Sequence, residues 1–249
     1  MRRLLHFRTL VMDTVKLQQP TTTFLLDRHE PVVSVTTWPE ARIVDFIVAH
    51  PALRTFFLDV LLRTPGAFVR TRAIEPFISD RSRKPGDVDV MVADRPDEAL
   101  AIECKRVKLT AIDQAHNRVN KLEQLADGVQ QANALHDLGF FQTYFAILTA
   151  VDARIQTHRN IPNRGLDPET THNYGEANTF TRLVEFPNRE RLHEEIGILF
   201  LELVQTTGAN LTDQCILGLC IDHQAQPRLQ TSRITNCINE CVSVTRRRH

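Results

Sequence analysis

Two carboxylates and a lysine lie close enough in the chain to act together in metal-assisted hydrolysis. Asp89 lies in the segment 87–90, and Glu103 and Lys105 form a Glu-x-Lys pair a short distance further on. Carboxylate oxygens are hard ligands that suit Mg²⁺, and the peptide carbonyl of Cys104 would add a third oxygen. Such a metal lowers the pKa of a bound water, which Lys105 would orient or help to deprotonate.

The apolar residues around these side chains alternate with period two, which predicts that two strands carry them. In the segment 87–92, the valines would share one face and Asp89 would lie on the other. In the segment 99–105, Glu103 and Lys105 would share the face opposite to the apolar residues. If the two strands pair as a hairpin, the three polar side chains converge on one face of a sheet.

A helix is expected on the N-terminal side of these strands. Thr37 fits the N-cap position, Pro39 the first turn and Glu40 the capping-box position. Apolar residues then recur at helical spacing from Ile43 to Leu61, and Pro51 is expected to split this helix into two pieces.

The remaining patterns complete an order of helix, three strands, helix and strand, followed by further elements. The expected strands cover residues 67–74, 87–92, 99–105, 143–150 and 215–221, and the expected helices cover residues 110–138 and 188–206. The long helix between the third and fourth strands predicts a parallel crossover connection.

The segments Gly86-Asp87-Val88-Asp89-Val90 and Ala101-Ile102-Glu103-Cys104-Lys105 resemble the PD-(D/E)xK motif of the restriction-endonuclease-like nuclease superfamily. The resemblance covers roughly residues 37–152, and the superfamily has the same order of elements. It implies an α/β fold, with a mixed central sheet in an αβββαβ core. The core would span 37–154, between an N-terminal extension at 1–36 and an α/β extension at 155–249 packed on it.

The resemblance also implies a function for the motif residues. Asp89 and Glu103, with the Cys104 carbonyl, would bind Mg²⁺ or Mn²⁺, and Lys105 would assist the attacking water. The expected activity is metal-dependent hydrolysis of phosphodiester bonds, with DNA as the expected substrate. Many members of the superfamily act as dimers, so a homodimer is a further expectation.

Several other polar residues are candidates for the same site. Many members of the superfamily place a glutamate on the first helix, which would be Glu40; its alternative role is the capping box. Glu75 ends the first strand, and Asp87 would replace its neighbour as ligand if the register differed by two residues. In some relatives a glutamine on the helix after Glu-x-Lys faces the site, which indicates Gln130 or Gln131.

Basic residues near the motif are candidates for contacts with nucleic acid: Arg83, Lys84, Arg106 and Lys108. The formal net charge of the chain is zero, which argues mildly against a large non-specific footprint on nucleic acid.

Other readings of the motif remain open. Asp87-x-Asp89 alone would suit a nucleotidyltransferase, although no Gly-Ser pair precedes it. A nuclease-like fold can also serve as a catalytically silent module that binds nucleic acid. The simplest alternative is a cross-strand charge cluster on a solvated sheet face, where such pairs stabilise little.

The hydropathy of the chain and the spacing of its cysteines give two further expectations. No apolar run approaches the roughly 20 residues of a membrane span, and the N-terminus lacks a continuous apolar core, so we expect a cytoplasmic protein. Four cysteines in the last quarter have spacings that depart from the common Cys-x2-Cys zinc pattern: Cys215, Cys220, Cys237 and Cys241.

Overall fold

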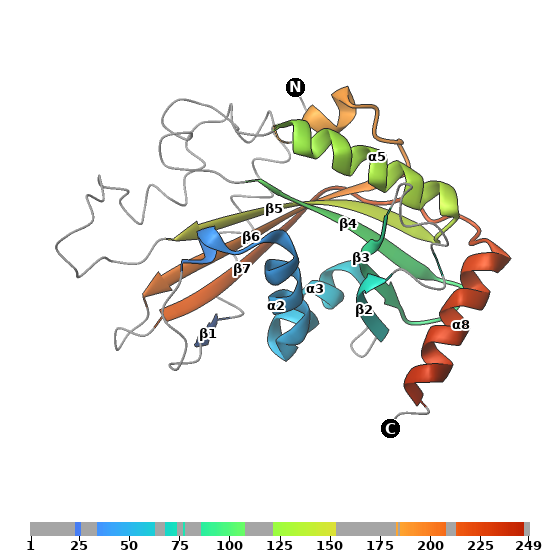
Figure 1. The fold of residues 1–249 in the computed structure, drawn as a ribbon, viewed down its shortest axis with the longest axis horizontal. Coiled ribbons are helices and arrows are strands. Elements are labelled where there is room, and N and C mark those ends of the chain that lie inside the picture. The colour runs from blue at the N-terminus through green and yellow to red at the C-terminus, as the bar shows by residue number, and fades with distance from the viewer. Residues whose placement is uncertain are drawn as a thin grey trace.

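The protein is a mixed α/β structure built on one seven-stranded sheet (Figure 1). The computed structural model describes residues 23–25, 34–62, 68–73, 77, 86–107, 122–152, 183, 185–207 and 213–246. The α/β class expected from the sequence is confirmed, since helices and strands alternate along the chain.

The sheet combines antiparallel and parallel pairs. Its strands are β1 (Thr23–Leu25), β2 (Phe68–Ala73), β3 (Val88–Ala93), β4 (Ala99–Val107), β5 (Gln142–Asp152), β6 (Gly197–Thr207) and β7 (Asp213–His223). The order across the sheet is β1-β7-β6-β5-β4-β3-β2. β4, β5 and β6 are parallel neighbours, and every other neighbouring pair is antiparallel.

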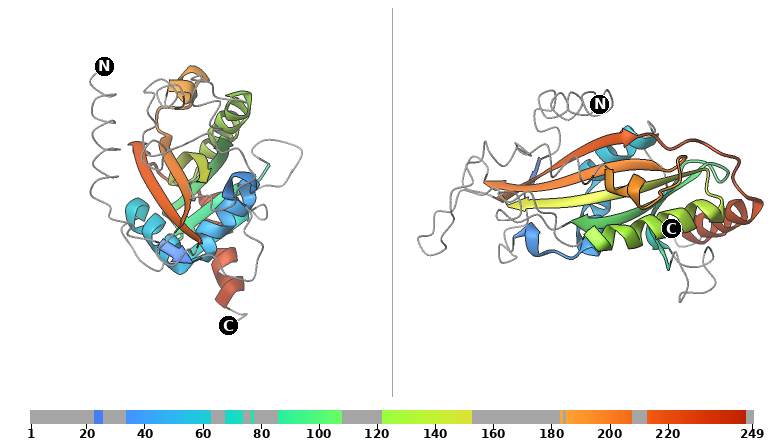
Figure 2. Two further views of the ribbon diagram at one scale, coloured as in Figure 1. Left: turned by 90° about the vertical axis from the view of Figure 1, so that its left-hand side faces the viewer. Right: turned by 90° about the horizontal axis from the view of Figure 1, so that it is seen from above.

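Helices cover both faces of the sheet (Figures 1 and 2). They are the short 3-10 helix η1 (Val35–Thr37), α2 (Glu40–Ala49), α3 (Pro51–Leu62), α5 (Leu122–Leu138) and α8 (Ser232–Arg246). The predicted split at Pro51 is confirmed, because α3 begins there. Within the described parts of the chain, no helix combines the length and the apolar character that crossing a bilayer requires.

The alternation along β4 sorts its side chains between the two faces. Leu100, Ile102 and Cys104 belong to the core cluster that includes the buried residues of α2 and α3. Ala99 and Ala101 belong to a second cluster on the opposite face, together with buried residues of α5 and α8. The predicted orientation of β4 is therefore confirmed, and it leaves Glu103 and Lys105 on the face covered by α5.

β3 follows the predicted alternation only in part. Val90 and Val92 pack in the cluster beneath α2 and α3, as expected. Val88 does not share their face, because it packs with Ala73 and Phe77 in the cluster on the opposite face. The pairing of β3 with β4 ends at Val90, so the start of β3 is not held in the plane of the ladder.

The helix predicted over residues 188–206 is wrong. Gly197–Thr207 forms strand β6, and the described helical residues shortly before it are Leu183 and residues 185–189. β6 lies between β5 and β7, and its apolar side chains are buried on both faces of the sheet, in the cluster beneath α2 and α3 and in a cluster with residues of α5. A strand buried on both faces has a nearly continuous apolar sequence, which resembles a helix segment in its hydrophobic pattern.

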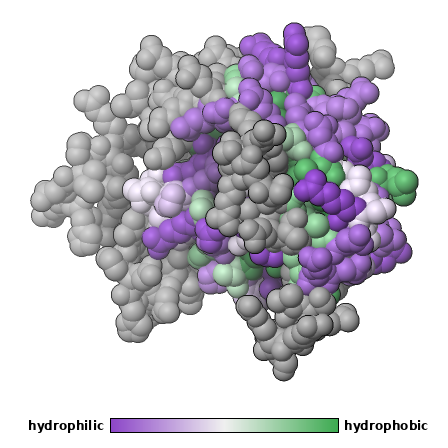
Figure 3. Space-filling model, turned by 45° about the vertical axis from the view of Figure 1, so that its right-hand side comes forward, coloured by the Kyte–Doolittle hydropathy of each residue, from purple (hydrophilic) through white to green (hydrophobic). Residues whose placement is uncertain are grey.

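Both extensions contribute strands to the same sheet. Residues 155–249 supply β6 and β7, and β1 from the N-terminal extension pairs with β7. Val35 begins the 3-10 helix η1, which lies between β1 and α2 in the chain. In the view of Figure 3, polar residues cover most of the coloured surface, with smaller apolar areas between them.

Candidate functional site

Asp89 lies where β3 and β4 stop pairing. The ladder ends with Val90 opposite Ile102, whereas β4 continues to Val107. Beyond the ladder, the Cys104 N–H donates to Asp89 Oδ2 at 2.7 Å. The N–H and C=O of one strand residue point to the same edge, so the Cys104 carbonyl also points toward the Asp89 side of β4.

Glu40 binds the same edge of β4 one pair of residues further on. Arg106 N–H donates to Glu40 Oε2 at 2.5 Å. The capping-box prediction is wrong, because Pro39 occupies the N-cap without a side-chain hydrogen bond and Thr37 donates its hydroxyl to the Ser34 carbonyl. Glu40 instead points across to the strand from the first residue of α2.

The Lys105 ammonium lies between the carboxylates of Glu103 on β4 and Glu40 on α2. Its Nζ lies 2.8 Å from Glu103 Oε1 and 3.7 Å from Glu40 Oε1. The side chains of Glu103, Lys105 and Glu40 are 2%, 18% and 30% exposed, so the cluster runs from a buried carboxylate to a partly open one. We call Asp89, Glu103, Lys105 and Glu40 the acidic site.

Burial dominates the protonation of the two inner carboxyls. It raises the pKa of Asp89 to about 6, against the opposing effects of the Cys104 N–H and Lys105, while the Glu40 and Asp87 charges add to the rise. It also raises the pKa of Glu103 well above its usual value, and the neighbouring Asp89 charge raises it further.

Lys105 remains charged in this environment. Burial alone would lower its pKa, but the charges of Glu103, Glu40 and Asp89 outweigh burial and raise the pKa above its ordinary value. A fixed ammonium beside carboxylates is suited to orienting a water and to offsetting the charge of a phosphate.

The acidic site has the donor types that suit a divalent cation, but Asp89, Glu103 and Glu40 are not among the described residues that bring three ligand atoms within 4.8 Å of one another. Three carboxylates face one ammonium, and buried carboxylates are unfavourable without a further positive charge. Asp89, Glu103 and the Cys104 carbonyl offer oxygen atoms, the donors that Mg²⁺ and Mn²⁺ prefer. The Cys104 thiol is on the other face of β4, and burial raises its pKa, so it packs as a neutral side chain.

Helix α5 passes beside the segment that leads into Asp89. Gln131 Nε2 lies 3.9 Å from the place where a β carbon would stand on Gly86, whose φ of +84° suits glycine. Gln131 is therefore beside the segment that leads into Asp89. Gln130 is exposed, so of the two predicted glutamines Gln131 is the one that the structure places near the site.

Asp87 and Arg106 have other surroundings. Asp87 is half-buried just before β3, and its charge contributes to the raised pKa of Asp89. Arg106 is buried, and its guanidinium donates to the carbonyls of Trp38 and Thr36. The Arg106 guanidinium is therefore committed to the η1–α2 segment.

Four predicted site residues lie outside the described parts of the chain: Glu75, Arg83, Lys84 and Lys108. Three of the four C-terminal cysteines lie on different faces of the sheet, since Cys215 packs beneath α2 and α3, whereas Cys237 and Cys241 of α8 pack on the opposite face. These three cysteines therefore do not form one site.

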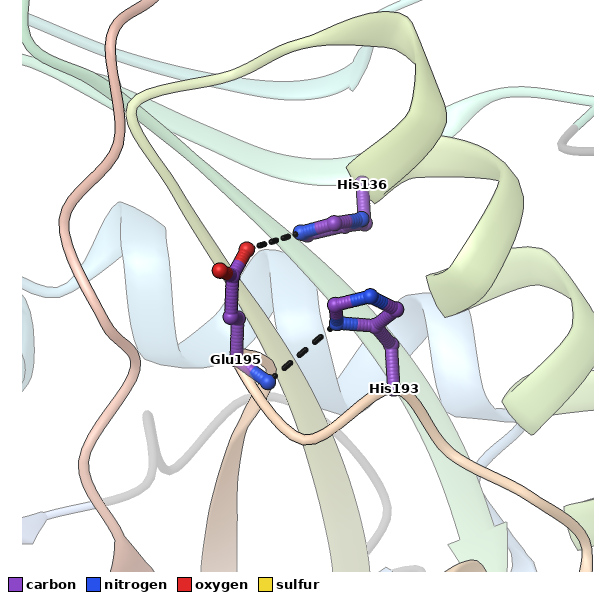
Figure 4. Close-up of side chains that lie close together, drawn as sticks. All are labelled: His136, His193 and Glu195. Atoms are coloured by element: carbon purple, nitrogen blue, oxygen red, sulfur yellow. Dashed lines mark hydrogen bonds and ion pairs between the residues drawn. The ribbon is translucent and has the colours of Figure 1, made fainter.

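A second cluster of ligand-type residues joins two segments that are distant in sequence (Figure 4). The ligand atoms of His136, His193 and Glu195 lie within 4.8 Å of one another, so the group could hold a metal ion. His136 Nε2 lies 2.9 Å from Glu195 Oε2, and the two imidazole rings stack with centroids 4.1 Å apart. Sequence reasoning missed this cluster, because only His193-x-Glu195 is a local signal.

Arg228 already occupies one side of this second cluster. Its Nη1 lies 2.9 Å from His136 Nε2 and donates to the His136 carbonyl at 3.2 Å. The hydrogen bond with His136, more than the nearby positive charges, lowers the pKa of Glu195. A guanidinium beside a ligand nitrogen opposes a second cation, so we interpret the cluster as a hydrogen-bonded junction between α5 and two loops.

Comparison with known proteins adds no assignment: no family model and no curated protein sequence matches this chain.

Proposed function

We propose that the protein is a metal-dependent nuclease that hydrolyses phosphodiester bonds, with DNA as its substrate. The observation that carries the proposal is the acidic site at the free edge of β4. There Asp89 of β3 accepts from the Cys104 amide, and Glu103 of β4 and Glu40 of α2 lie on either side of the Lys105 ammonium. Excess buried negative charge next to a fixed ammonium is the arrangement that metal-assisted phosphodiester hydrolysis needs.

The order of elements supports assignment to the PD-(D/E)xK superfamily as part of this proposal. Helices α2 and α3 precede β2, β3 and β4, and α5 then crosses to the parallel strand β5. This is the αβββαβ order of the restriction-endonuclease-like core. The motif residues lie on β3 and β4, as they would in that core.

Each residue of the acidic site has a proposed role. Asp89, Glu103 and the Cys104 carbonyl would hold Mg²⁺ or Mn²⁺, and Glu40 is placed to bind a water of the ion or the ion itself. When bound, the metal would polarise the phosphodiester and lower the pKa of the attacking water. Lys105 would orient that water and offset the phosphate charge.

Contacts with the nucleic acid would come from basic residues outside the acidic site. Arg83, Lys84 and Lys108 keep this role as predictions from the sequence. Phosphate contacts position a nucleic acid without reading its sequence, so no sequence preference follows from them.

Two alternatives make different predictions for the same residues. In a nucleotidyltransferase, Asp87 and Asp89 would bind metal together without Glu103, whereas Asp89 here binds the amide of the Glu-x-Lys strand. A catalytically silent module would bind Mg²⁺ and nucleic acid without cleaving it.

The test incubates the purified chain with plasmid, linear and single-stranded DNA and with RNA, each with Mg²⁺, Mn²⁺ or chelator. We expect cleavage of DNA that requires the metal. Lys105→Met should lower the cleavage rate by about 100-fold or more, from the loss of the group that orients the water. Mg²⁺ binding, measured by calorimetry, should persist in this variant because the carboxylates remain.

The control is Asp97→Asn, whose carboxylate is exposed in the turn after β3 and should not affect cleavage. A Lys105→Met variant that cuts DNA as fast as the parent would refute the assignment. Mg²⁺ binding without cleavage of any substrate would favour the silent module.

A further inference from the structure

Helix α5 has a glycine at the point where it crosses Lys105. Gly128 is buried in the interior of α5. A β carbon here would lie 2.2 Å from Lys105 Cγ and 2.7 Å from Phe145 Cε2, distances at which atoms overlap. The space that a side chain would fill is therefore taken by the lysine stem and by the edge of an aromatic ring.

The glycine is unusual for its position. A helix-interior glycine lowers stability because it gives the unfolded chain more freedom than other residues do. Gly128 is the one interior glycine among the helices that the structure describes. The loss of stability from Gly128 is offset if the close approach of α5 to β4 holds a functional group in its working position.

The functional group is the Lys105 ammonium. A lysine has a flexible stem, and holding it in one conformation costs side-chain entropy. Here the stem is confined between the α5 backbone and Phe145, and Nζ lies 2.8 Å from Glu103 Oε1. The stem therefore has little room to leave this position while α5 remains in place.

We infer that Gly128 is a positioning residue for Lys105. By leaving room on α5 for the lysine stem, it fixes the ammonium beside Glu103, where the attacking water of the proposed reaction would be held. The inference rests on the proposed nuclease function. Its competitor is a purely structural role, in which Gly128 only accommodates Phe145.

Thermal unfolding of the full chain separates these roles. Gly128→Ala is made in the parent, in Lys105→Met, which keeps an unbranched stem, and in Lys105→Ala, which removes it. We expect Tm to fall by about 5 °C in the first two backgrounds and by less than half of that in Lys105→Ala. An equal fall in Tm in all three backgrounds would show that Gly128 only makes room for Phe145, and it would overturn the inference.

A variant that does not fold also gives an answer. If Gly128→Ala unfolds the parent, we expect the Lys105→Ala background to recover the folded state and the Lys105→Met background not to do so. Failure to fold in both backgrounds contradicts a role through Lys105.

Kinetics test whether the position of the ammonium matters for cleavage. We expect Gly128→Ala to lower kcat by about 10- to 100-fold, with KM for DNA and Mg²⁺ affinity unchanged. Gly218→Ala is the matched control, because its β carbon would meet only Glu202 at 3.9 Å. An unchanged kcat in Gly128→Ala would overturn the inference.

Failure of the inference and failure of the proposed function remain distinguishable. If the parent cleaves no nucleic acid, the nuclease proposal fails, and the unfolding measurements alone decide whether Gly128 places Lys105. If the parent cleaves DNA and Gly128→Ala cleaves equally well, only the positioning role fails.

Discussion

At the scale of single residues, Asp89 experiences opposing effects on its ionisation. Burial raises its pKa to about 6, although the Cys104 N–H and Lys105 both favour the charged form. In the unfolded chain the group returns to 3.8. Between about pH 4 and pH 6 the folded state therefore holds more protons, so the free energy of unfolding falls as the pH rises through this window.

This sign predicts that Asp89→Asn stabilises the metal-free protein at neutral pH. The asparagine removes the buried charge and keeps an oxygen that can accept from Cys104. The raised pKa corresponds to roughly 2–3 kcal/mol, so we expect Tm at pH 7.5 to rise by about 4–8 °C. The gain should largely disappear at about pH 4, where Asp89 is protonated in the folded parent.

Unfolding scans at both pH values in the presence of chelator measure this effect. Asp97→Asn, which removes an exposed carboxylate, should leave Tm unchanged and serves as the control. A Tm at pH 7.5 that is equal to or below that of the parent would show that Asp89 is not held against its preferred charge state.

At the scale of the elements, the site depends on how η1 and α2 are attached to the sheet. The Arg106 guanidinium donates to the carbonyls of Trp38 and Thr36, and its backbone N–H donates to Glu40. At the start of η1, the Val35 N–H donates to Oε1 of the buried Gln205 of β6 at 2.9 Å. These bonds hold the start of α2 against the edge of β4 where Asp89 binds.

The attachment predicts that Arg106→Lys destabilises the protein. Lysine keeps the positive charge but cannot donate to two carbonyls through a planar fork, so a buried carbonyl loses its partner. We expect a loss of about 1–3 kcal/mol, which lowers Tm by about 2–10 °C, together with faster hydrogen exchange in α2.

The same substitution distinguishes this structural role of Arg106 from a role in contacting nucleic acid. A phosphate contact tolerates lysine, so a role in binding would leave Tm unchanged and would alter the affinity for DNA only slightly. Arg189→Lys is the control, because Arg189 is 69% exposed in its pair with Glu185.

At the scale of the whole molecule, local periodicity predicted the elements that carry the motif. The alternation in 99–105 correctly assigned Glu103 and Lys105 to the face opposite Ile102, because side chains of a strand must alternate. The same reasoning failed for β6, whose apolar run is explained only by its place between β5 and β7.

Contacts between distant segments were the part that the sequence could not specify. Glu40 looked like a capping residue, and its contact with Arg106 depends on how α2 lies against β4. His136 meets His193 and Glu195 only because α5 ends beside the loop before β6. Neither the packing angle of a helix nor the path of a loop follows from hydrophobic period alone.

The most direct measurement of the central claim is the location of Mn²⁺ by anomalous diffraction from crystals of the full chain soaked at about neutral pH. The account predicts a peak between Asp89 and Glu103, within coordination distance of both carboxylates, that is lost in Asp89→Asn. No peak at the acidic site, with Mn²⁺ found instead at His136, His193 and Glu195, would contradict it.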